Sequence, residues 1–343
     1  MGGVNELDMA DRTATGRLDR SLGDLAEATH AAAVEVVALS KTYPGGVEAV
    51  KGIDFEIAPG EVFGVLGPNG AGKSTTIGML TTTIAPSAGT ARLVGYDVVT
   101  TPLLARGVSS VVFQEAVVDR GLSGMANLEL HARLWGVKPA QASSRISELL
   151  DALGLAELIE RPAGSYSGGE RRRLEIARAL VSEPRVLFLD EPTVGLDPRI
   201  RHELLDVIAG LRARGRMTIL LTTHYLDEAQ RLCDRVAIMH LGEIVALDTP
   251  AALLAGLGDA VLEVRVEGDA AAALELLRRR DVATPQAFAV GSTLTLPLTG
   301  RGVAETLAAI DETDLTTAGV ITRAPTLDDV YLRLTGARIA DPA

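Results

Sequence analysis

Cysteine is almost absent from this chain of 343 residues, in which Cys233 is the only one. A disulfide within the chain is therefore impossible, and a reducing compartment fits this composition. Aromatic residues are also scarce, at 3%, and Asp plus Glu outnumber Lys plus Arg by 45 to 33, a net charge of −12. Such a chain lacks both the basic face that phosphate backbones require and the rings on which bases stack. We therefore expect no nucleic-acid partner.

Long apolar runs are missing too. No run reaches the roughly 18 residues of a membrane-spanning helix, and no segment resembles a secretion signal. We expect that this chain does not cross a membrane, so that any membrane-spanning partner is another polypeptide. Apolar residues nevertheless make up 47% of the sequence, which is enough for a sizeable core. The length favours two folded units, or one large unit with an appendage.

The chain divides into three parts by pattern. Residues 1–33 have no sustained apolar face, which is typical of a disordered tail. Residues 34–258 contain short β-rich runs, and the block at about residues 115–182 is helical. This order predicts an α/β nucleotide-binding domain with a mostly helical subdomain. The expected strands are Val34–Leu39, Ile53–Ile57, Glu61–Leu66, Thr90–Val94, Val108–Phe113, Val186–Leu189, Thr218–Thr222 and Val236–Met239.

Residues 259–343 follow another pattern. Leu262, Val264 and Val266 alternate with charged residues, which predicts a half-buried strand. The next expected elements are a helix at Asp269–Arg280, strands at Ala287–Val290 and Thr293–Leu298, a helix with Val303, Leu307 and Ile310 on one face, and a strand near Thr317–Arg323. The order βαββαβ predicts a small ferredoxin-like α+β accessory domain. A last helix, Leu327–Leu334, has Thr326 as its N-cap and stops at Gly336.

The strongest motif is a glycine-rich loop, Gly67-Pro68-Asn69-Gly70-Ala71-Gly72-Lys73-Ser74, followed by Thr75. It fits the P-loop pattern and lies between a predicted strand and a predicted helix. The glycines let N–H groups turn towards phosphate oxygens, and the helix N-terminus adds partial positive charge. Lys73 would reach the β- and γ-phosphates, and Ser74 would bind Mg²⁺. By itself, the motif does not distinguish kinases, GTPases and transporters.

Two acids end a second predicted strand. Asp190 and Glu191 directly follow the apolar run Val186–Leu189. Asp190 is expected to hold Mg²⁺ beside the P-loop. Glu191 points in another direction and is expected to polarise the attacking water.

The segment Tyr166-Ser167-Gly168-Gly169-Glu170 resembles the signature of ABC transporter ATP-binding subunits, usually L-S-G-G-Q. Over about residues 34–255 the family's other motifs stand in the family's order. They are Tyr43 at the place of the adenine-stacking aromatic, the P-loop, the Q-loop glutamine Gln114, the Asp190–Glu191 pair, the D-loop Gly195-Leu196-Asp197-Pro198 and the switch histidine His224. The ending from Ala324 to Gly336 looks like that of the daunorubicin-resistance exporter type.

The resemblance implies a P-loop ABC ATPase core with ATP and Mg²⁺ as cofactors. It implies catalytic roles for Lys73, Glu191 and His224, nucleotide contacts from Asp197, and metal contacts from Ser74, Gln114 and Asp190. Ser167, Gly168 and Gly169 would bind the γ-phosphate held by a second copy, which makes an ATP-sandwich dimer. The dimer would dock on separate integral-membrane permease subunits at the cytoplasmic face of the membrane. It would power export of a drug, antibiotic or lipid-like metabolite.

The signature departs from the family's pattern at two positions. Tyr166 replaces leucine, and Glu170 places an acid where a triphosphate is expected to bind. The backbone donors survive both changes. Arg171, Arg172 and Arg173 follow at an unusual place, since cations disfavour a helix N-terminus. They either offset Glu170, attract phosphate or form a solvated cluster.

Two other functions stay open at this point. One is an importer ATPase with a regulatory C-terminal domain, and the other is a soluble ABC ATPase that takes no part in transport. The single P-loop, the lack of heptad stretches between Gly72 and Tyr166, and the acidic charge disfavour the soluble class. The last helix either buries Leu327, Val330 and Leu334 on its own domain or contacts a dimer partner.

Overall fold

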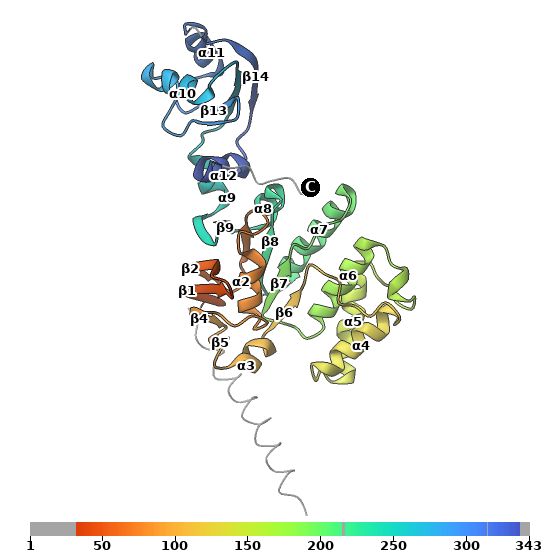
Figure 1. Cartoon of the computed structure of the whole chain (residues 1–343). Coiled ribbons are helices and arrows are strands. Elements are labelled where there is room, and N and C mark those ends of the chain that lie inside the picture. Colours follow the sequence, from red (N-terminus) through yellow and green to blue (C-terminus); the bar gives the residue numbers. More distant parts are fainter. Residues whose placement is uncertain (1–31, 215–216, 314, 337–343) are drawn as a thin grey trace, which may run out of the picture.

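The structure, a computed structural model, describes residues 32–214, 217–313 and 315–336 (Figure 1). Of the predicted tail, residues 1–31 lie outside the described residues. Ala33 is buried, donates its N–H to Ile57 O and accepts from Val94 N. The folded part therefore includes at least one residue of the segment that was predicted as tail.

A six-stranded sheet with the order β10-β9-β3-β8-β7-β6 forms the centre of the first part. Neighbouring strands from β9 to β6 are parallel, and only β10 is antiparallel to its neighbour. Every residue of β3, β7 and β8 is buried, as expected of parallel strands covered on both faces. The bounds are β3 Val62–Leu66, β6 Ser109–Val112, β7 Val186–Asp190, β8 Thr218–Thr223, β9 Arg235–His240 and β10 Glu243–Asp248.

An antiparallel sheet with the order β2-β1-β4-β5 lies beside the central one. Its strands are β1 Val34–Tyr43, β2 Val47–Ile57, β4 Ala88–Leu93 and β5 Tyr96–Asp97. Helix α2, Lys73–Leu80, shares a core with both sheets, in which the rings of Phe55 and Phe63 stack at 5.2 Å. This core supports the strand and helix on either side of the P-loop.

The helical block consists of α4 Gly124–Leu134, α5 Pro139–Leu153 and α6 Gly168–Leu180. Leu128, Ile146 and Leu150, which show helical spacing in the sequence, are buried between these helices and the central sheet. Four further helices were not predicted: α3 Pro102–Gly107, α7 Pro198–Arg214, α8 Leu226–Leu232 and α9 Pro250–Ala255. No helix in the described ranges is both long and apolar enough to cross a membrane.

The C-terminal part has the predicted βαββαβ order. Its elements are β11 Val261–Val266, α10 Ala270–Arg279, β12 Phe288–Val290, β13 Thr293–Pro297, α11 Val303–Asp311 and β14 Thr317–Arg323. The sheet order β12-β13-β11-β14 with antiparallel neighbours is that of a ferredoxin-like fold, which confirms the predicted fold class. Leu262, Val264, Leu294 and Leu296 form a separate core there.

The last helix, α12 at Leu327–Thr335, returns to the first part. Its N-terminus has a capping box between Thr326 and Asp329, and Gly336 ends it in a left-handed conformation. Leu327 and Tyr331 are buried in the core of the first part. The Tyr331 hydroxyl lies 2.7 Å from Nδ1 of His240 at the end of β9. Of the two alternatives left open for this helix, packing on its own domain alone is therefore wrong, and contact with a dimer partner stays a prediction.

Candidate active site

The P-loop connects β3 to α2 and has a backbone that favours glycine at two positions. Gly70 and Gly72 have φ of 82° and 105°, and a Cβ on Gly72 would lie 2.5 Å from Ala49 O. A Cβ on Gly67 would lie 2.4 Å from Met239 O. Because Gly72 is also the N-cap of α2, no side chain caps the first N–H groups of this helix. They are left to bind an anion.

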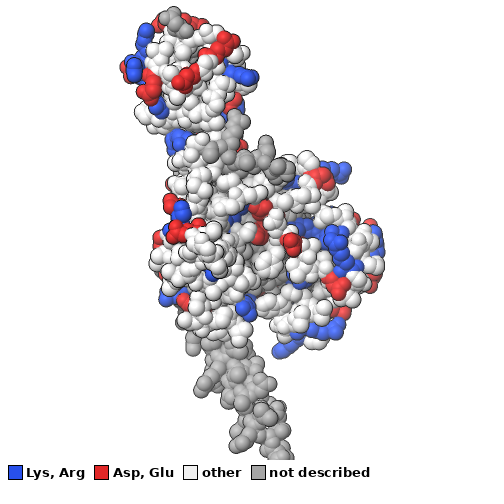
Figure 2. Space-filling model, in the orientation of Figure 1, with Lys and Arg blue, Asp and Glu red and all other residues white. Residues whose placement is uncertain are grey.

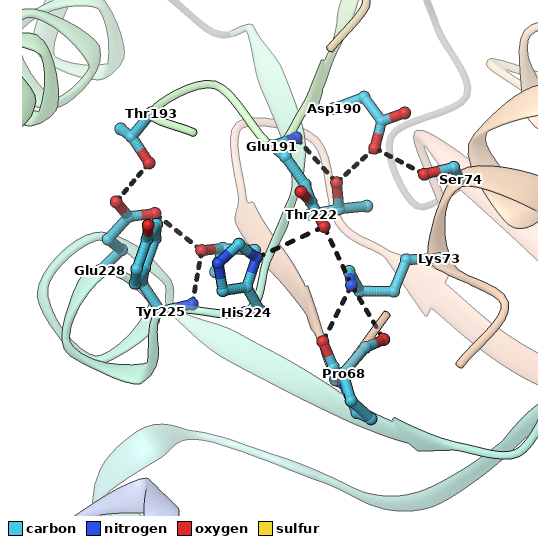
Figure 3. Close-up of polar contacts among 12 residues, drawn as sticks. Pro68, Lys73, Ser74, Asp190, Glu191, Thr193, Thr222, His224, Tyr225 and Glu228 are labelled. Atoms are coloured by element: carbon cyan, nitrogen blue, oxygen red, sulfur yellow. Dashed lines mark hydrogen bonds and ion pairs between the residues drawn. The ribbon is translucent and has the colours of Figure 1, made fainter. Parts of the chain in front are cut away.

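The ammonium of Lys73 is buried over this loop (Figure 3). It donates to Gly67 O at 2.8 Å and to Pro68 O at 3.1 Å. It also makes an ion pair with Glu191 Oε1 at 3.0 Å, and the two side chains are only 4% and 6% exposed. The end of β7 and the P-loop are thus joined through one buried charge pair.

Asp190 lies beside Ser74 at the first turn of α2. The Ser74 hydroxyl donates to Asp190 Oδ1 at 3.3 Å. In the described part of the chain, no group of three or more His, Cys, Asp or Glu could bind a metal ion by itself. Mg²⁺ nevertheless fits, because it is usually held by one or two protein oxygens together with phosphate and water oxygens.

Thr222 near the end of β8 was not predicted as a site residue. Its hydroxyl donates to Asp190 Oδ1 at 2.6 Å and accepts the N–H of Glu191 at 2.9 Å. The signal in the sequence was a pair of polar residues ending an apolar strand. The role of Thr222 could not be predicted from the sequence, because it depends on the register of β7 with β8, which sets Asp190 opposite Thr222.

Glu191 has a strained backbone. Its φ of 44° lies in the left-handed region, which costs a residue with a side chain about 1–2 kcal/mol. This conformation turns the carboxylate away from Asp190 and between Lys73 and His224. Nδ1 of His224 is 3.6 Å from Glu191 Oε1.

His224 is largely buried, and within the described residues neither ring nitrogen has a hydrogen-bond partner. Its ring packs on Tyr225 with centroids 4.2 Å apart, and the Arg201 guanidinium lies 3.8 Å from the Tyr225 ring centre. Buried polar atoms normally have partners. Unpaired ring nitrogens beside Glu191 and Lys73 therefore fit a ligand oxygen such as that of a terminal phosphate.

The buried carboxylate of Glu228 holds the loops that follow β7 and β8. Glu228 accepts hydrogen bonds from Thr193, Thr223 and Arg201, and it is nearly inaccessible to solvent. Thr193 follows the Asp190–Glu191 pair, and Thr223 directly precedes His224. Glu228 thus fixes both loops to α8 and was not identified from the sequence.

Three predicted site residues, Tyr43, Gln114 and Asp197, make no hydrogen bond to Lys73, Asp190, Glu191 or His224 within the described residues. The hydroxyl of half-buried Tyr43 lies 3.5 Å from Thr75 Oγ1, so its ring is near the first turn of α2. Gln114 is exposed, and its side chain makes no hydrogen bond within the ranges that the structure describes. It reaches the same edge as Asp190 because β6 pairs in parallel with β7. Asp197 is exposed and accepts from Ile200 N at the start of α7.

The signature forms the N-terminus of α6 with Ser167 as its N-cap. Ser167 N donates to Glu170 Oε2 at 2.7 Å, and Glu170 N donates to Ser167 Oγ at 3.3 Å, which is a capping box. The backbone hydrogen bond from Ser167 lowers the pKa of Glu170, and the charges of Arg161 and Arg173 add to this effect. The unexpected acid therefore caps its own helix.

The other departures have structural reasons. Tyr166 is buried and donates to Leu158 O at 2.6 Å. Lys and Arg side chains gather on the visible face of the helical block (Figure 2). The solvated-cluster interpretation is wrong for Arg172, which is only 7% exposed. Arg171 and Arg173 donate to the carbonyls of Tyr166 and Leu153.

A phosphate loop after β3, a carboxylate pair at the end of β7 and a histidine after β8 define the class of protein as a P-loop ATPase. The family model described as ABC transporter matches residues 50–194. The daunorubicin/doxorubicin resistance ATP-binding protein DrrA of Streptomyces peucetius is 42% identical over 310 residues, which cover 89% of this chain and 92% of that protein. This chain belongs to the ABC transporter family, as an ATP-binding, ATP-hydrolysing protein of the daunorubicin-resistance type.

Two further comparisons agree with this membership. The linearmycin resistance ATP-binding protein LnrL of Bacillus subtilis (strain 168) is 33% identical over 308 residues, 88% of this chain and 98% of that protein. Among solved structures, cbiO1 from Clostridium perfringens, part of the ABC transporter complex cbiONQ, superposes with a TM-score of 0.62. It is 29% identical and covers 66% of this chain and 92% of its own.

Replacing Thr222 with valine should impair the site with little change of shape. Asp190 loses a donor and the buried Glu191 N–H loses its acceptor, which costs about 1–3 kcal/mol of stability. We expect ATP turnover to fall at least about tenfold and more Mg²⁺ to be needed for half-maximal rate. Titrating Mg²⁺ in a steady-state ATPase assay measures both effects.

Thr218→Val is the matched control, because Thr218 is buried at the opposite end of the same strand and bonds Gly60 N and Ala58 O. It should lose similar stability and keep its Mg²⁺ dependence. Equal Mg²⁺ dependence in the two variants would contradict the assignment of Thr222.

Proposed function

We propose that this chain hydrolyses ATP to power export of a drug, an antibiotic or a lipid-like metabolite through permease subunits on separate chains. The observation that carries the chemical part is the convergence of Lys73, Glu191 and His224 at one edge of the sheet. The export part is supported by relatives named for resistance to daunorubicin, doxorubicin and linearmycin. The comparisons do not favour an importer or a soluble ABC ATPase.

Binding of ATP is assigned to the P-loop. The N–H groups of the loop and of the first turn of α2 surround the β- and γ-phosphates, and Lys73 neutralises them. Tyr43 stacks on the adenine, since its ring lies beside Thr75. Ser74 and Asp190, together with Gln114, hold Mg²⁺, which when bound neutralises charge on the phosphate oxygens.

Glu191 is the proposed general base. Its carboxylate is ion-paired with Lys73, so a phosphate oxygen that binds Lys73 competes for the same ammonium. The released carboxylate can then accept a proton from water that attacks the γ-phosphate. His224 donates a hydrogen bond to that phosphate, which gives a partner to one of its two ring nitrogens without a hydrogen bond.

The signature is proposed to act on the ATP of a second copy. Ser167 and Gly168 are exposed, and within the described residues no hydrogen bond joins them to Lys73 or Ser74. The N-terminus of α6 presents N–H groups and a positive dipole end, which suit the γ-phosphate in the partner's P-loop. Two copies with two shared ATP molecules then form the working dimer at the cytoplasmic face of the membrane.

Mixing two inactive variants tests this sharing. Ser167→Arg should bind ATP but not turn it over, and Lys73→Ala should fail to bind ATP. A mixed dimer retains one complete site, built from Lys73 of one copy and Ser167 of the other. An equal mixture should therefore recover up to about a quarter of the wild-type rate, because half of the dimers are mixed and each has one of two sites.

Ser144→Arg is the control for adding an arginine to the helical block, since Ser144 is exposed on α5. It should be active alone. No recovery in the mixture, with both variants folded, would contradict the shared site.

Affinity purification from detergent-solubilised membranes tests the export assignment. We expect a protein with several membrane-spanning helices to co-purify with the tagged chain. Membrane vesicles that contain both should then move a resistance-type drug with ATP. Vesicles with Glu191→Gln should bind ATP without transport, because the proposed base is lost. Co-purification of the tagged chain with a solute-binding protein, or with soluble proteins alone, would overturn the export assignment.

A further inference from the structure

Arg172 is a buried cation that the proposed chemistry does not use. It is the fifth residue of α6, and its guanidinium bonds acceptors in three separate segments of the chain. It donates to Phe113 O after β6, to Asp190 O at 3.0 Å in β7 and to Glu175 Oε2 at 3.0 Å in its own helix. Its Nε donates to Pro192 O at 2.8 Å. A solvent-facing arginine would not need so complete a set of partners.

Two of these acceptors lie on either side of Glu191. The Asp190 carbonyl precedes Glu191, and the Pro192 carbonyl follows it. The peptide between Asp190 and Glu191 is also bonded at its other end, because Thr222 accepts the Glu191 N–H. One guanidinium and one hydroxyl therefore fix the backbone of the single active-site carboxylate with a left-handed φ of 44°. A strained backbone persists only where its surroundings determine it in this way.

We propose that Arg172 is a positioning residue for ATP hydrolysis, which holds the Glu191 backbone in the conformation that aims its carboxylate at the reacting phosphate. This assignment rests on the role of Glu191 proposed above. Arg172 touches neither nucleotide nor water in this scheme and acts through Glu191 alone.

The ion pair between Arg172 and Glu175 also contacts the segment that carries Gln114. Arg172 bonds the carbonyl just before Gln114, and Glu175 Oε1 accepts Val117 N at 2.7 Å just after it. The N-terminus of α6 is thus tied to the strand ends that carry Gln114 and Glu191. When Ser167 engages a partner's nucleotide, Arg172 provides a direct mechanical connection from that helix end to the base.

Arg172→Lys tests the proposal, because lysine keeps the positive charge for Glu175 and lacks the planar fork that bonds several carbonyls at once. We expect kcat to fall about 10- to 100-fold, as for a misplaced catalytic group. The KM and the binding constant for ATP should stay within about twofold, because the P-loop is untouched.

Arg145→Lys is the matched control. Arg145 is a partly buried arginine of α5 that bonds a carbonyl, Val181 O, and a carboxylate, Glu183, away from Glu191. It should lose a similar amount of thermal stability and keep kcat. Equal kcat losses in the two variants would reduce Arg172 to a structural residue and overturn the proposal.

A double-mutant cycle separates this proposal from the proposed function. In a Glu191→Gln background, single-turnover hydrolysis should fall less than about twofold further on adding Arg172→Lys, because a residue that acts through Glu191 has nothing left to position. A further tenfold loss, or a wild-type kcat for Arg172→Lys alone, overturns the role of Arg172. Full activity of Glu191→Gln would instead overturn the role of Glu191.

Should Arg172→Lys fail to fold, the doubly neutral variant Arg172→Gln with Glu175→Gln replaces it. Neither buried charge is then left unpaired, and the glutamine at 175 can still accept from Val117 N. The same fall in kcat at constant KM is expected, and an unchanged kcat contradicts the proposal.

Discussion

The ion pair between Lys73 and Glu191 is the contact on which the arrangement of the site depends. A buried charge is costly unless it is paired and hydrogen-bonded, and Lys73 satisfies both requirements with two loop carbonyls and one carboxylate. These partners come from the ends of β3 and β7. The pair therefore fixes how close the P-loop and Glu191, the proposed general base, lie. When a nucleotide binds, its phosphate oxygens replace protein oxygens as the partners of Lys73.

Around that pair, neutral and charged side chains hold the backbone rather than the ligand. Thr222 bonds both the side chain of Asp190 and the N–H of Glu191, while Arg172 bonds the carbonyls on either side of Glu191. Glu228 fixes the loop that ends in His224. The result is a rigid edge of the sheet, which suits chemistry that relies on positioning and on charge already in place.

The sequence was informative wherever a local pattern determines a local structure. The P-loop, the apolar strand before Asp190 and the βαββαβ order were all predicted, because glycine spacing, apolar runs and alternation depend on neighbours in the chain. The caps of α12 at Thr326 and Gly336 were predicted for the same reason. The pattern Ser167-x-x-Glu170 also signals a capping box, and it was missed because Glu170 was compared only with the family's glutamine.

What the sequence did not reveal depends on contacts between distant segments. A solvated cluster was one of three alternatives for Arg172, because its partners, Phe113 and Asp190, are 59 and 18 residues away. Helix α7 was not predicted because its apolar stripe, which contains Leu204, Leu205 and Ile208, is narrow and lies among many charged residues in the sequence. The docking of Tyr331 on His240 likewise links residues 91 positions apart. Periodicity within one element contains no information on such pairs.

We propose that the ammonium of Lys73 binds the phosphates of ATP. Equilibrium titration of the full chain with ATP and Mg²⁺, compared between wild type, Lys73→Ala and Lys138→Ala, tests it most directly. Lys138 is exposed at the N-terminus of α5 and serves as the control for loss of a lysine. We expect Lys73→Ala to weaken binding at least about a hundredfold, the size expected when a buried, charge-paired contact is lost, and Lys138→Ala to bind as wild type. Equal affinity for all three proteins would contradict it.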